Sequence, residues 1–258
     1  MTDVKKGDKP YAQYSRNVHD RKNAMPMILG GIALAIVVIG VVAFLLTRSE
    51  DKSDTAGAGT GAEAAKDATQ ETASVTISGE DLPVLNLSQG QLLGAPGEDP
   101  AVGMEIPKLA GQTFDGSDLT IDPADGKPKV ILFLAHWCPH CQAEVPLIKE
   151  YIDSGNAPED VEFYSVATQT DAGKANYPPS GWLAREGWQP PVLLDDSSGS
   201  AAQSYGAPGW PYMVFVGADG KVVQRGSGEV PIEQFEAAVQ QLSASGGAAA
   251  TSTSTPAA

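Results

Sequence analysis

The chain of 258 residues predicts an α/β fold in which a mixed central sheet carries helices on both faces. Two observations predict this class. The apolar run 130–135 is bounded by polar residues, which is typical of a strand covered on both faces. Strand-like and helix-like segments then alternate, and the last of them are a hairpin followed by a helix. We place this domain at residues 101–243.

The helix after the first predicted strand begins near Pro139 and ends at Gly155. Its apolar residues recur at helical spacing on one face, and they are Cys141, Val145, Ile148 and Ile152. Pro146 lies inside this helix, where it removes the hydrogen bond to the Gln142 carbonyl. We therefore expect a kink at that point.

The middle of the domain is assigned by the same criteria. Residues 161–167 are predicted to be a second buried strand, and residues 192–194 a short one. Between them, residues 180–186 form a short helical stretch that contains Trp182 and precedes Trp188. The two tryptophans could line a substrate groove, but core packing is the commoner use of such residues.

A hairpin and a helix close the domain. Residues 212–216 and 221–223 are predicted strands that the turn 218–220 connects. A final helix follows Pro231, and its apolar face is formed by Ile232, Phe235, Val239 and Leu242. The segment 244–258 is rich in Ala, Ser, Thr and Gly, and we expect it to be disordered.

The N-terminal part of the chain predicts a transmembrane signal-anchor. Residues 26–46 carry no charge and are long enough for about 31 Å of helix, which matches the hydrocarbon thickness of a bilayer. A cleaved signal peptide is the alternative. Its apolar run would be shorter, about 7 to 15 residues, and the small residues suited to cleavage, 56–58, lie well beyond the span. An uncleaved anchor is therefore favoured.

The charges that flank the span predict its orientation. The tail 1–25 contains six Lys and Arg, more than the three that follow the span up to Lys66. The tail is therefore expected in the cytoplasm, and everything after residue 46 outside the cell membrane. The alanine-rich, lysine-poor composition suggests a bacterial protein.

Residues 47–100 are predicted to be an extracytoplasmic linker that is partly disordered. Residues 47–74 contain no aromatic residue, Ile, Leu or Val, so they cannot bury enough surface to fold. As a flexible chain they would span roughly 30 Å on average. Residues 75–100 contain apolar residues interrupted by Gly and Pro, and the sequence leaves their order open.

Charge and cysteine content exclude several classes of function. The chain has 17 Lys and Arg against 32 Asp and Glu, and because residues 1–25 have a net charge of +3, the remainder carries −18. Such a chain lacks the basic stripe that nucleic-acid binding needs. Two cysteines also exclude a multi-disulfide scaffold and a four-thiolate zinc site.

The candidate chemistry lies where the first strand meets its helix, in the motif Trp137-Cys138-Pro139-His140-Cys141. Pro139 suits the first helical position, because its missing N–H costs nothing there, and this places Cys138 at the helix N-cap. Backbone amides and the positive end of the helix dipole then favour a thiolate. We expect the Cys138 pKa to fall below the usual value of about 8.5, so Cys138 is the predicted nucleophile.

Cys141 and His140 complete the motif. Cys141 is on the same helical face, within disulfide reach of Cys138 and deeper in the turn, so it is the predicted resolving thiol. A protonated His140 would favour the Cys138 thiolate and hence the reduced state, which makes the disulfide a stronger oxidant. The alternative is an exposed histidine without an electronic role.

With these residues the chain resembles the thioredoxin-like disulfide oxidoreductases over about residues 101–243. The resemblance rests on Trp137-Cys-x-x-Cys after a buried strand and on Gly209-Trp210-Pro211-Tyr212 before the hairpin. It implies a thioredoxin-like fold and a cis peptide bond at Pro211, which would face the cysteine pair. Trp137, Trp210 and Pro211 are the implied substrate-binding residues. The resemblance implies no dissociable cofactor, only the redox-active pair of cysteines.

Two subfamilies resemble this site in different ways. Pro139-His140 is similar to the dipeptide of strongly oxidising periplasmic enzymes such as DsbA. The continuation from Cys141 to Pro146 and the single anchor are similar to the TlpA/ResA group, which includes thiol reductants of cytochrome c maturation. In that group a glutamate three residues after the second cysteine handles its proton, and Glu144 stands there. A surface glutamate is the alternative. Leu132 stands where thioredoxin has a buried aspartate, which leaves Glu144 as the only carboxylate near the motif in sequence.

A copper or zinc site is a further hypothesis for the same segment. Its ligands would be Cys138, Cys141, His136 and His140. Four ligands within six residues do not converge easily on a tetrahedral ion, and Cys-x-x-Cys differs from the Cys-x-x-x-Cys of copper-delivery relatives. We therefore expect no metal.

The sequence thus predicts a membrane-anchored thiol:disulfide oxidoreductase that acts on the thiols and disulfides of secreted proteins. Oxidation is favoured because of Pro139-His140. The alternatives are a reductant in cytochrome c maturation, a redox-inert binding module with a structural disulfide, and a copper-delivery protein. A membrane redox partner or a second thiol protein must exchange electrons with the pair, and the sequence does not identify it.

Overall fold

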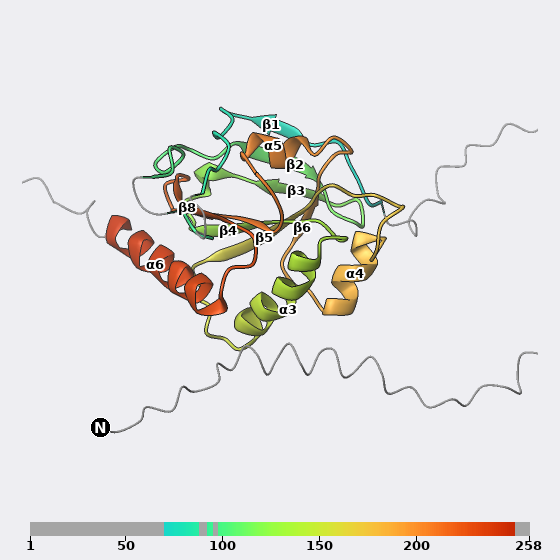
Figure 1. The fold of residues 1–258 in the computed structure, drawn as a ribbon. Coiled ribbons are helices and arrows are strands. Elements are labelled where there is room, and N and C mark those ends of the chain that lie inside the picture. The colour runs from blue at the N-terminus through green and yellow to red at the C-terminus, as the bar shows by residue number, and fades with distance from the viewer. Residues whose placement is uncertain (1–69, 88–91, 95–97, 251–258) are drawn as a thin grey trace, which may run out of the picture. The chain divides into compact units, whose positions relative to one another are not determined.

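The computed structural model describes residues 70–87, 92–94 and 98–250, and a five-stranded sheet lies at their centre (Figure 1). Its strands, in the order β6-β5-β4-β7-β8, are β6 (Val192–Leu194), β5 (Glu162–Ala167), β4 (Lys129–Leu134), β7 (Tyr212–Val216) and β8 (Val222–Ser227). β6, β5 and β4 are parallel, whereas β7 is antiparallel to β4 and to β8. The predicted mixed sheet is therefore confirmed.

The central strand β4 is covered on both faces. All six of its residues are buried, and the five after Lys129 alternate between two apolar clusters. Leu132 and Leu134 belong to the cluster on one face, and Ile131 and Phe133 to the cluster on the other. This is the arrangement that a continuous apolar run predicts for a central strand. The turn that contains the cysteine motif follows directly at its carboxyl end.

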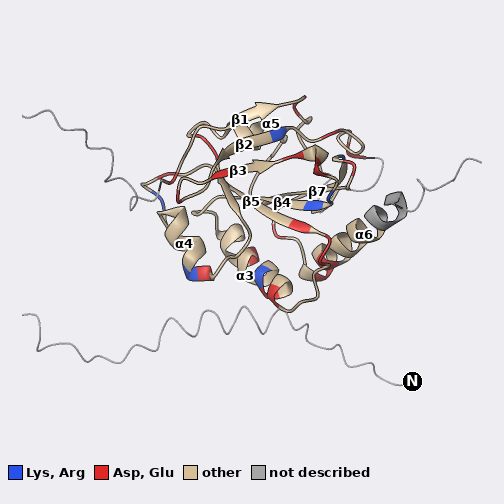
Figure 2. Ribbon diagram, turned by 180° about the vertical axis from the view of Figure 1, so that it is seen from behind, with Lys and Arg blue, Asp and Glu red and all other residues tan. Residues whose placement is uncertain are grey.

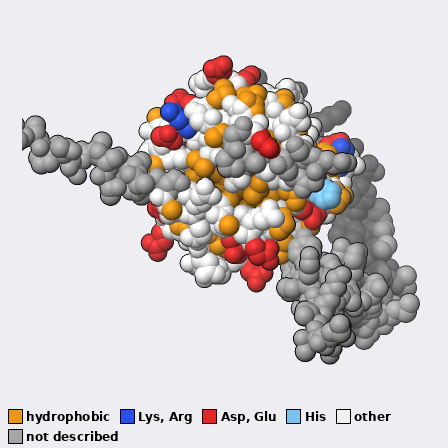
Figure 3. Space-filling model, turned by 60° about the vertical axis from the view of Figure 1, so that its left-hand side comes forward, with side chains coloured by type: hydrophobic (Ala, Val, Ile, Leu, Met, Phe, Trp, Pro, Cys, Tyr) orange, Lys and Arg blue, Asp and Glu red, His pale blue; other side chains and the backbone are white. Residues whose placement is uncertain are grey.

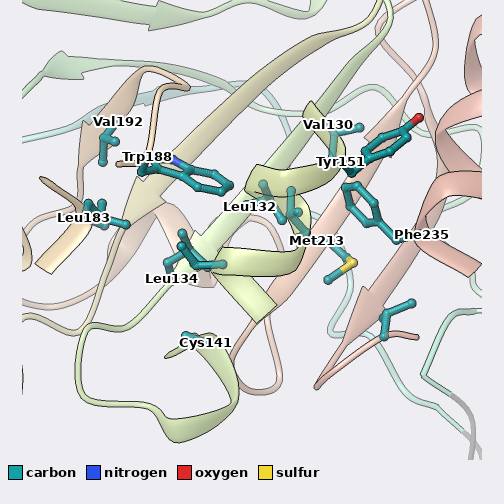
Figure 4. Packing of buried hydrophobic residues seen from close by; sticks show 14 of the residues in the cluster. Val130, Leu132, Leu134, Cys141, Tyr151, Leu183, Trp188, Val192, Met213 and Phe235 are labelled. Atoms are coloured by element: carbon teal, nitrogen blue, oxygen red, sulfur yellow. The ribbon is translucent and has the colours of Figure 1, made fainter. Parts of the chain in front are cut away.

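Three helices cover one face of the sheet (Figure 1). They are α3 (Pro139–Asp153), α4 (Pro179–Glu186) and α6 (Ile232–Ala250). Figure 4 shows Tyr151 of α3 beside Phe235 of α6, and the centroids of their rings are 6.0 Å apart in an edge-to-face arrangement. Cys141 and Leu134 lie at one end of the same cluster. The expected apolar faces of α3 and α6 therefore form this half of the core.

The other face is covered by the short helix α5 (Ser200–Ser204) together with a second, antiparallel sheet (Figure 1). Its strands, in the order β1-β2-β3, are β1 (Thr76–Ser78), β2 (Lys108–Gln112) and β3 (Asp118–Ile121), and the 3-10 helix η2 (Pro123–Asp125) follows. The prediction of helices on both faces thus holds, but no pattern in the sequence indicates that a small sheet shares the second face. These strands are short and partly exposed, so they lack a long apolar run.

The stretch 75–100, whose order the sequence leaves open, packs on the domain where it is described. β1 pairs with β2, and Leu82 and Leu85 are buried in the second cluster. Further along, Asp99 forms a buried ion pair with Arg225 of β8. The folded unit therefore includes residues N-terminal to the predicted boundary at 101.

Two predicted elements end later in the structure. The second strand of the hairpin, predicted at 221–223, continues to Ser227, and α6 continues to Ala250. Residues 244–250, part of the segment expected to be disordered, are helical in the structure. The predicted span 26–46 lies outside the described residues. Among those described, no helix has the length and apolar character needed to cross a bilayer.

The two tryptophans near α4 are core residues. Trp182 and Trp188 are buried in the first cluster, and the Trp188 Nε1–H donates to Ser165 Oγ at 3.0 Å. Figure 4 shows Trp188 directed toward Leu132. Core packing is therefore their role, and neither lines a substrate groove.

The described surface is acidic. Acidic residues outnumber basic ones along the ribbon (Figure 2), and the face in Figure 3 shows hydrophobic side chains among acidic ones. Two of the few basic residues, Lys129 and Arg225, are buried and paired with Asp125 and Asp99, so they add no positive charge to the surface. This distribution supports the exclusion of nucleic-acid binding.

Candidate active site

The turn after β4 places the first cysteine at the start of α3. Cys138 is the N-cap, with extended backbone angles (φ −75°, ψ 121°), and Pro139 occupies the first helical position. The Cys138 carbonyl accepts the first helical hydrogen bond from the Gln142 amide at 3.1 Å. The structure therefore has the helix start that the position of Pro139 predicts.

Cys138 lies in surroundings that favour its thiolate. Its pKa is lowered to about 6, mainly because the Cys141 thiol donates a hydrogen bond to it. Burial opposes this shift, while the amides of Cys141 and His140 and the charge of the His140 ring add to it. When Cys138 is protonated, its Sγ–H can donate a hydrogen bond to the Trp210 carbonyl at 3.4 Å. The side chain is thus largely ionised at neutral pH.

Cys141 has the opposite properties. It has no exposed surface, whereas Cys138 keeps 5% exposure. Burial raises the Cys141 pKa well above its ordinary value, and donation of its proton to Cys138 raises it further. Both cysteines are free thiols in the structure. The pair therefore combines an ionised cysteine that keeps slight exposure with a protonated cysteine that is fully buried.

Glu144 is a buried residue, so the alternative of an exposed surface glutamate is excluded. Its side chain is 2% exposed, and burial raises its pKa to about 8. The Val230 amide lowers this pKa in part by donating to the carboxylate at 3.2 and 3.4 Å, and the negative charge of Glu229 raises it. At neutral pH Glu144 therefore keeps a proton, one helical turn after Cys141.

His140 projects from α3 into solvent. Its side chain is 64% exposed, and Nδ1 lies 2.7 Å from Oε1 of Glu229. The hydrogen bond to Glu229 is the main cause that raises the His140 pKa, and the charges of Glu229 and Cys138 raise it further. The ring is thus held in its charged form to a higher pH than an ordinary histidine.

Trp210 and Pro211 lie across the site from α3. Their peptide bond is cis, as the resemblance implies, and the Trp210 carbonyl lies 3.4 Å from Cys138 Sγ. The Pro211 carbonyl accepts a hydrogen bond from the Gly228 amide at 2.8 Å, and β7 begins at the next residue. The hairpin therefore holds this segment beside the nucleophile.

A loop after β5 covers Trp137 on the other side. The indole N–H donates to the Gln169 carbonyl at 2.8 Å, and the Lys174 ammonium lies 3.7 Å from the ring centroid. His136 holds the same loop, because Nδ1 contacts the Ala175 carbonyl at 2.7 Å and Nε2 accepts from the Asp171 amide at 3.2 Å. The two residues before Cys138 thus anchor one wall of the site.

These contacts also test the metal hypothesis. Both ring nitrogens of His136 are engaged by backbone groups, so this ring cannot turn a nitrogen toward the cysteines without losing them. Within the described residues, no cluster of His, Cys, Asp and Glu has the arrangement of a metal site. The ligand set considered from the sequence is therefore not assembled here.

Replacing Glu144 by glutamine is expected to change the pH dependence of stability. Above its ordinary pKa of 4.5 the unfolded carboxyl loses its proton, while the folded one keeps it up to about pH 8. Between these two pH values the free energy of unfolding of the wild type falls as pH rises. The fall is about 1.4 kcal/mol per pH unit greater than in Glu144→Gln, which has no carboxyl group at this position. Urea unfolding of both reduced proteins across this range checks this. Equal pH dependence in the two would contradict the raised pKa.

Glu229 and Val230 of the β8–α6 loop belong to the site, although no sequence pattern points to them. They lie 89 and 86 positions from His140 and Glu144, the residues that they contact. Neither forms part of a motif, and only the fold brings them to the cysteine pair. The helical spacing of apolar residues after Pro231 indicates where α6 begins. It does not indicate which residues the loop before α6 contacts.

Comparison with known proteins gives a family match. The family model for redoxin matches residues 101–242. The chain is 33% identical over 112 residues to the soluble secreted antigen MPT53 of Mycobacterium tuberculosis, an alignment that covers 43% of this chain and 57% of that protein. The chain thus spans little more than half of that relative's length.

Other relatives carry names from thiol chemistry. The thiol-disulfide oxidoreductase ResA of Bacillus anthracis is 26% identical over 150 residues, which cover 56% of this chain and 80% of that one. A solved structure of a secreted Mycobacterium tuberculosis disulfide oxidoreductase has a TM-score of 0.44 and 24% identity, and covers 52% and 95% of the two chains. The redoxin model covers more than half of this chain, so the chain belongs to the redoxin family, and its resemblance to thioredoxin-like oxidoreductases is confirmed.

Proposed function

We propose that this protein is a membrane-anchored, extracytoplasmic thiol:disulfide oxidoreductase that exchanges disulfides through Cys138 and Cys141. The observation that supports this most strongly is the contrast between the two sulfurs. Cys138 has a pKa of about 6 and some exposure, whereas Cys141 is fully buried with a raised pKa. An attacking thiol and a resolving thiol need these opposite properties.

In the oxidising direction, a substrate thiolate attacks Cys138 Sγ in the Cys138–Cys141 disulfide. A mixed disulfide forms, and Cys141 leaves as a thiolate that takes up a proton. A second substrate thiolate then attacks the substrate sulfur of the mixed disulfide, and Cys138 leaves as the more stable thiolate. Two electrons pass from the substrate to the cysteine pair, and a redox partner must later remove them.

Glu144 is the proposed proton donor and acceptor for Cys141. It carries a proton at neutral pH and stands one turn further along α3. It can therefore supply the proton that the departing Cys141 thiolate needs, and accept it again in the reverse reaction. Pro139, at the first helical position, holds Cys138 where the amides of residues 140 and 141 reach its sulfur.

Trp137, Trp210 and Pro211 are the proposed substrate-binding residues. The Trp210 carbonyl lies 3.4 Å from Cys138 Sγ, so a chain that pairs with the Trp210 backbone would lie beside this sulfur. An extended substrate chain would pair with this backbone as an added strand does. The Trp137 ring, partly exposed beneath Lys174, would form the opposite side.

Net oxidation of secreted proteins is the proposed direction, because the low pKa of Cys138 and the charged His140 stabilise the reduced pair. The second candidate is a thiol reductant, which the buried Glu144 and the similarity to ResA support. Equilibration of the full-length protein with glutathione buffers decides between them. A potential well above that of thioredoxin, about −270 mV, supports oxidation, and a potential at or below it overturns that direction.

The location is part of the proposal. The uncharged span 26–46 and the basic tail before it support a single-pass anchor with the N-terminus in the cytoplasm. Protease treatment of spheroplasts, in which the cytoplasmic membrane is intact and the outer envelope has been removed, tests this location. Digestion of a C-terminal tag from the outside is expected, whereas full protection would place the domain in the cytoplasm.

A further inference from the structure

The loop between β8 and α6 contacts two titratable residues of α3, one on each side of Cys141 in the sequence. Glu229 Oε1 lies 2.7 Å from Nδ1 of His140, in the first turn of α3. The neighbouring Val230 amide donates to the carboxylate of Glu144, one turn further along the same helix. Two adjacent residues thus fix the side chains on either side of Cys141.

We propose that Glu229 is a positioning residue for thiol exchange: its carboxylate holds the His140 ring beside the start of α3 in the imidazolium form, so that the ring presents its charge to Cys138. This inference deepens the proposed function, on which it rests. It is carried by the 2.7 Å contact between the two side chains and by the position of His140 between the two cysteines.

The charged groups around His140 are consistent with this role. Glu229 faces the ring from the β8–α6 loop, and the Cys138 thiolate faces it from the N-cap of α3. Both anions favour the imidazolium, and the Glu229 hydrogen bond is the largest cause of the raised His140 pKa. In turn, the charge of His140 is one of the causes that lower the Cys138 pKa.

The same carboxylate has the opposite effect on Glu144. Its negative charge raises the Glu144 pKa, so it favours the protonated carboxyl. Cys141, which the Glu144 charge also affects, lies between the two on α3. Glu229 therefore favours a cation near the attacking sulfur and a neutral, proton-carrying group near the resolving sulfur, which are the states that the proposed exchange uses.

A surface ion pair without effect on the thiols is the competing explanation. The His140 and Glu229 side chains are 64% and 35% exposed, and pairs in such positions contribute little to stability. A measurement of stability therefore cannot distinguish the two explanations. Titration of His140 and of Cys138 can, because only the proposed role links the Glu229 charge to the sulfur.

The test is Glu229→Gln in the full-length reduced protein. We expect the His140 pKa, followed by the NMR shifts of its ring protons, to fall. The Cys138 pKa should rise by about half a unit to one unit, which slows alkylation by iodoacetamide roughly two- to fivefold near pH 6. Glu233→Gln removes the same charge from an exposed position in the first turn of α6, and it is expected to leave both titrations unchanged.

A second variant tests whether the effect passes through His140. In a His140→Gln background, Glu229→Gln is expected to leave the alkylation profile of Cys138 as it was. The inference is overturned if Glu229→Gln leaves the His140 and Cys138 titrations unchanged, or if it shifts Cys138 equally without His140. Neither readout needs a protein substrate. A parallel assay of insulin disulfide exchange by the wild type therefore reports separately on the proposed function.

Discussion

Replacing Cys138 by serine abolishes disulfide exchange, whereas replacing Cys141 by alanine leaves a protein that reacts once and stops. Serine lacks the ionised sulfur on which both half-reactions depend, so we expect turnover with insulin and glutathione to fall at least about 1000-fold. Without Cys141, the mixed disulfide at Cys138 has no internal thiol to resolve it. Non-reducing electrophoresis of the Cys141→Ala protein from its host should then show trapped substrate adducts.

The two variants serve as controls for each other. Adducts that form in Cys141→Ala and disappear in the double variant with Cys138→Ser must pass through Cys138. A redox-inert binding module predicts no adducts and unchanged function in Cys138→Ser, which would contradict the proposed exchange. A copper-delivery protein predicts a copper complex that is lost with either cysteine and with a histidine.

Replacing Arg225 by methionine has the largest expected effect on stability. Arg225 is fully buried, and its guanidinium donates to both carboxylate oxygens of Asp99 and to the Pro83 and Tyr205 carbonyls. It also donates to the hydroxyl of Tyr212, the residue that follows Pro211, at 3.1 Å. Methionine would leave the buried Asp99 charge unpaired, so we expect a loss of about 3 to 5 kcal/mol in the free energy of unfolding.

Urea unfolding of the wild type and the variant measures this loss. The matched control is the double variant Arg225→Met with Asp99→Leu, in which no buried charge remains. It should recover part of the lost stability, because most of the cost comes from the uncompensated carboxylate. A loss below about 1 kcal/mol in Arg225→Met would show that Asp99 finds water or another partner.

The elements that position the cysteines could be predicted because their patterns are local. The apolar run 130–135 corresponds to β4, and the helix expected from Pro139 is α3. Pro139 and the spacing of the cysteines likewise specify the helix start, which determines the properties of the Cys138 sulfur. In contrast, β1, β2 and β3 are short and partly exposed, and their pairing depends on contacts across the fold.

The site could be predicted only in part for the same reason. Cys138, Cys141 and His140 belong to one motif, but the surroundings of Glu144 include the β8–α6 loop, whose Val230 amide contacts its carboxylate. Glu229 carries no local signal, because nothing in the sequence distinguishes it from the many other acidic residues of the chain. Contacts between distant segments therefore set the charges around a motif that is itself local.

The most direct test of this account is the pH dependence of the Cys138 thiolate in the reduced full-length protein. Ultraviolet absorbance of the thiolate and the rate of alkylation, each compared with Cys138→Ser, give its pKa. We predict one thiol that titrates near pH 6, and a second that stays protonated through the neutral range. A single titration near the ordinary cysteine value of about 8.5, or a Cys138 that resists alkylation, would contradict the account.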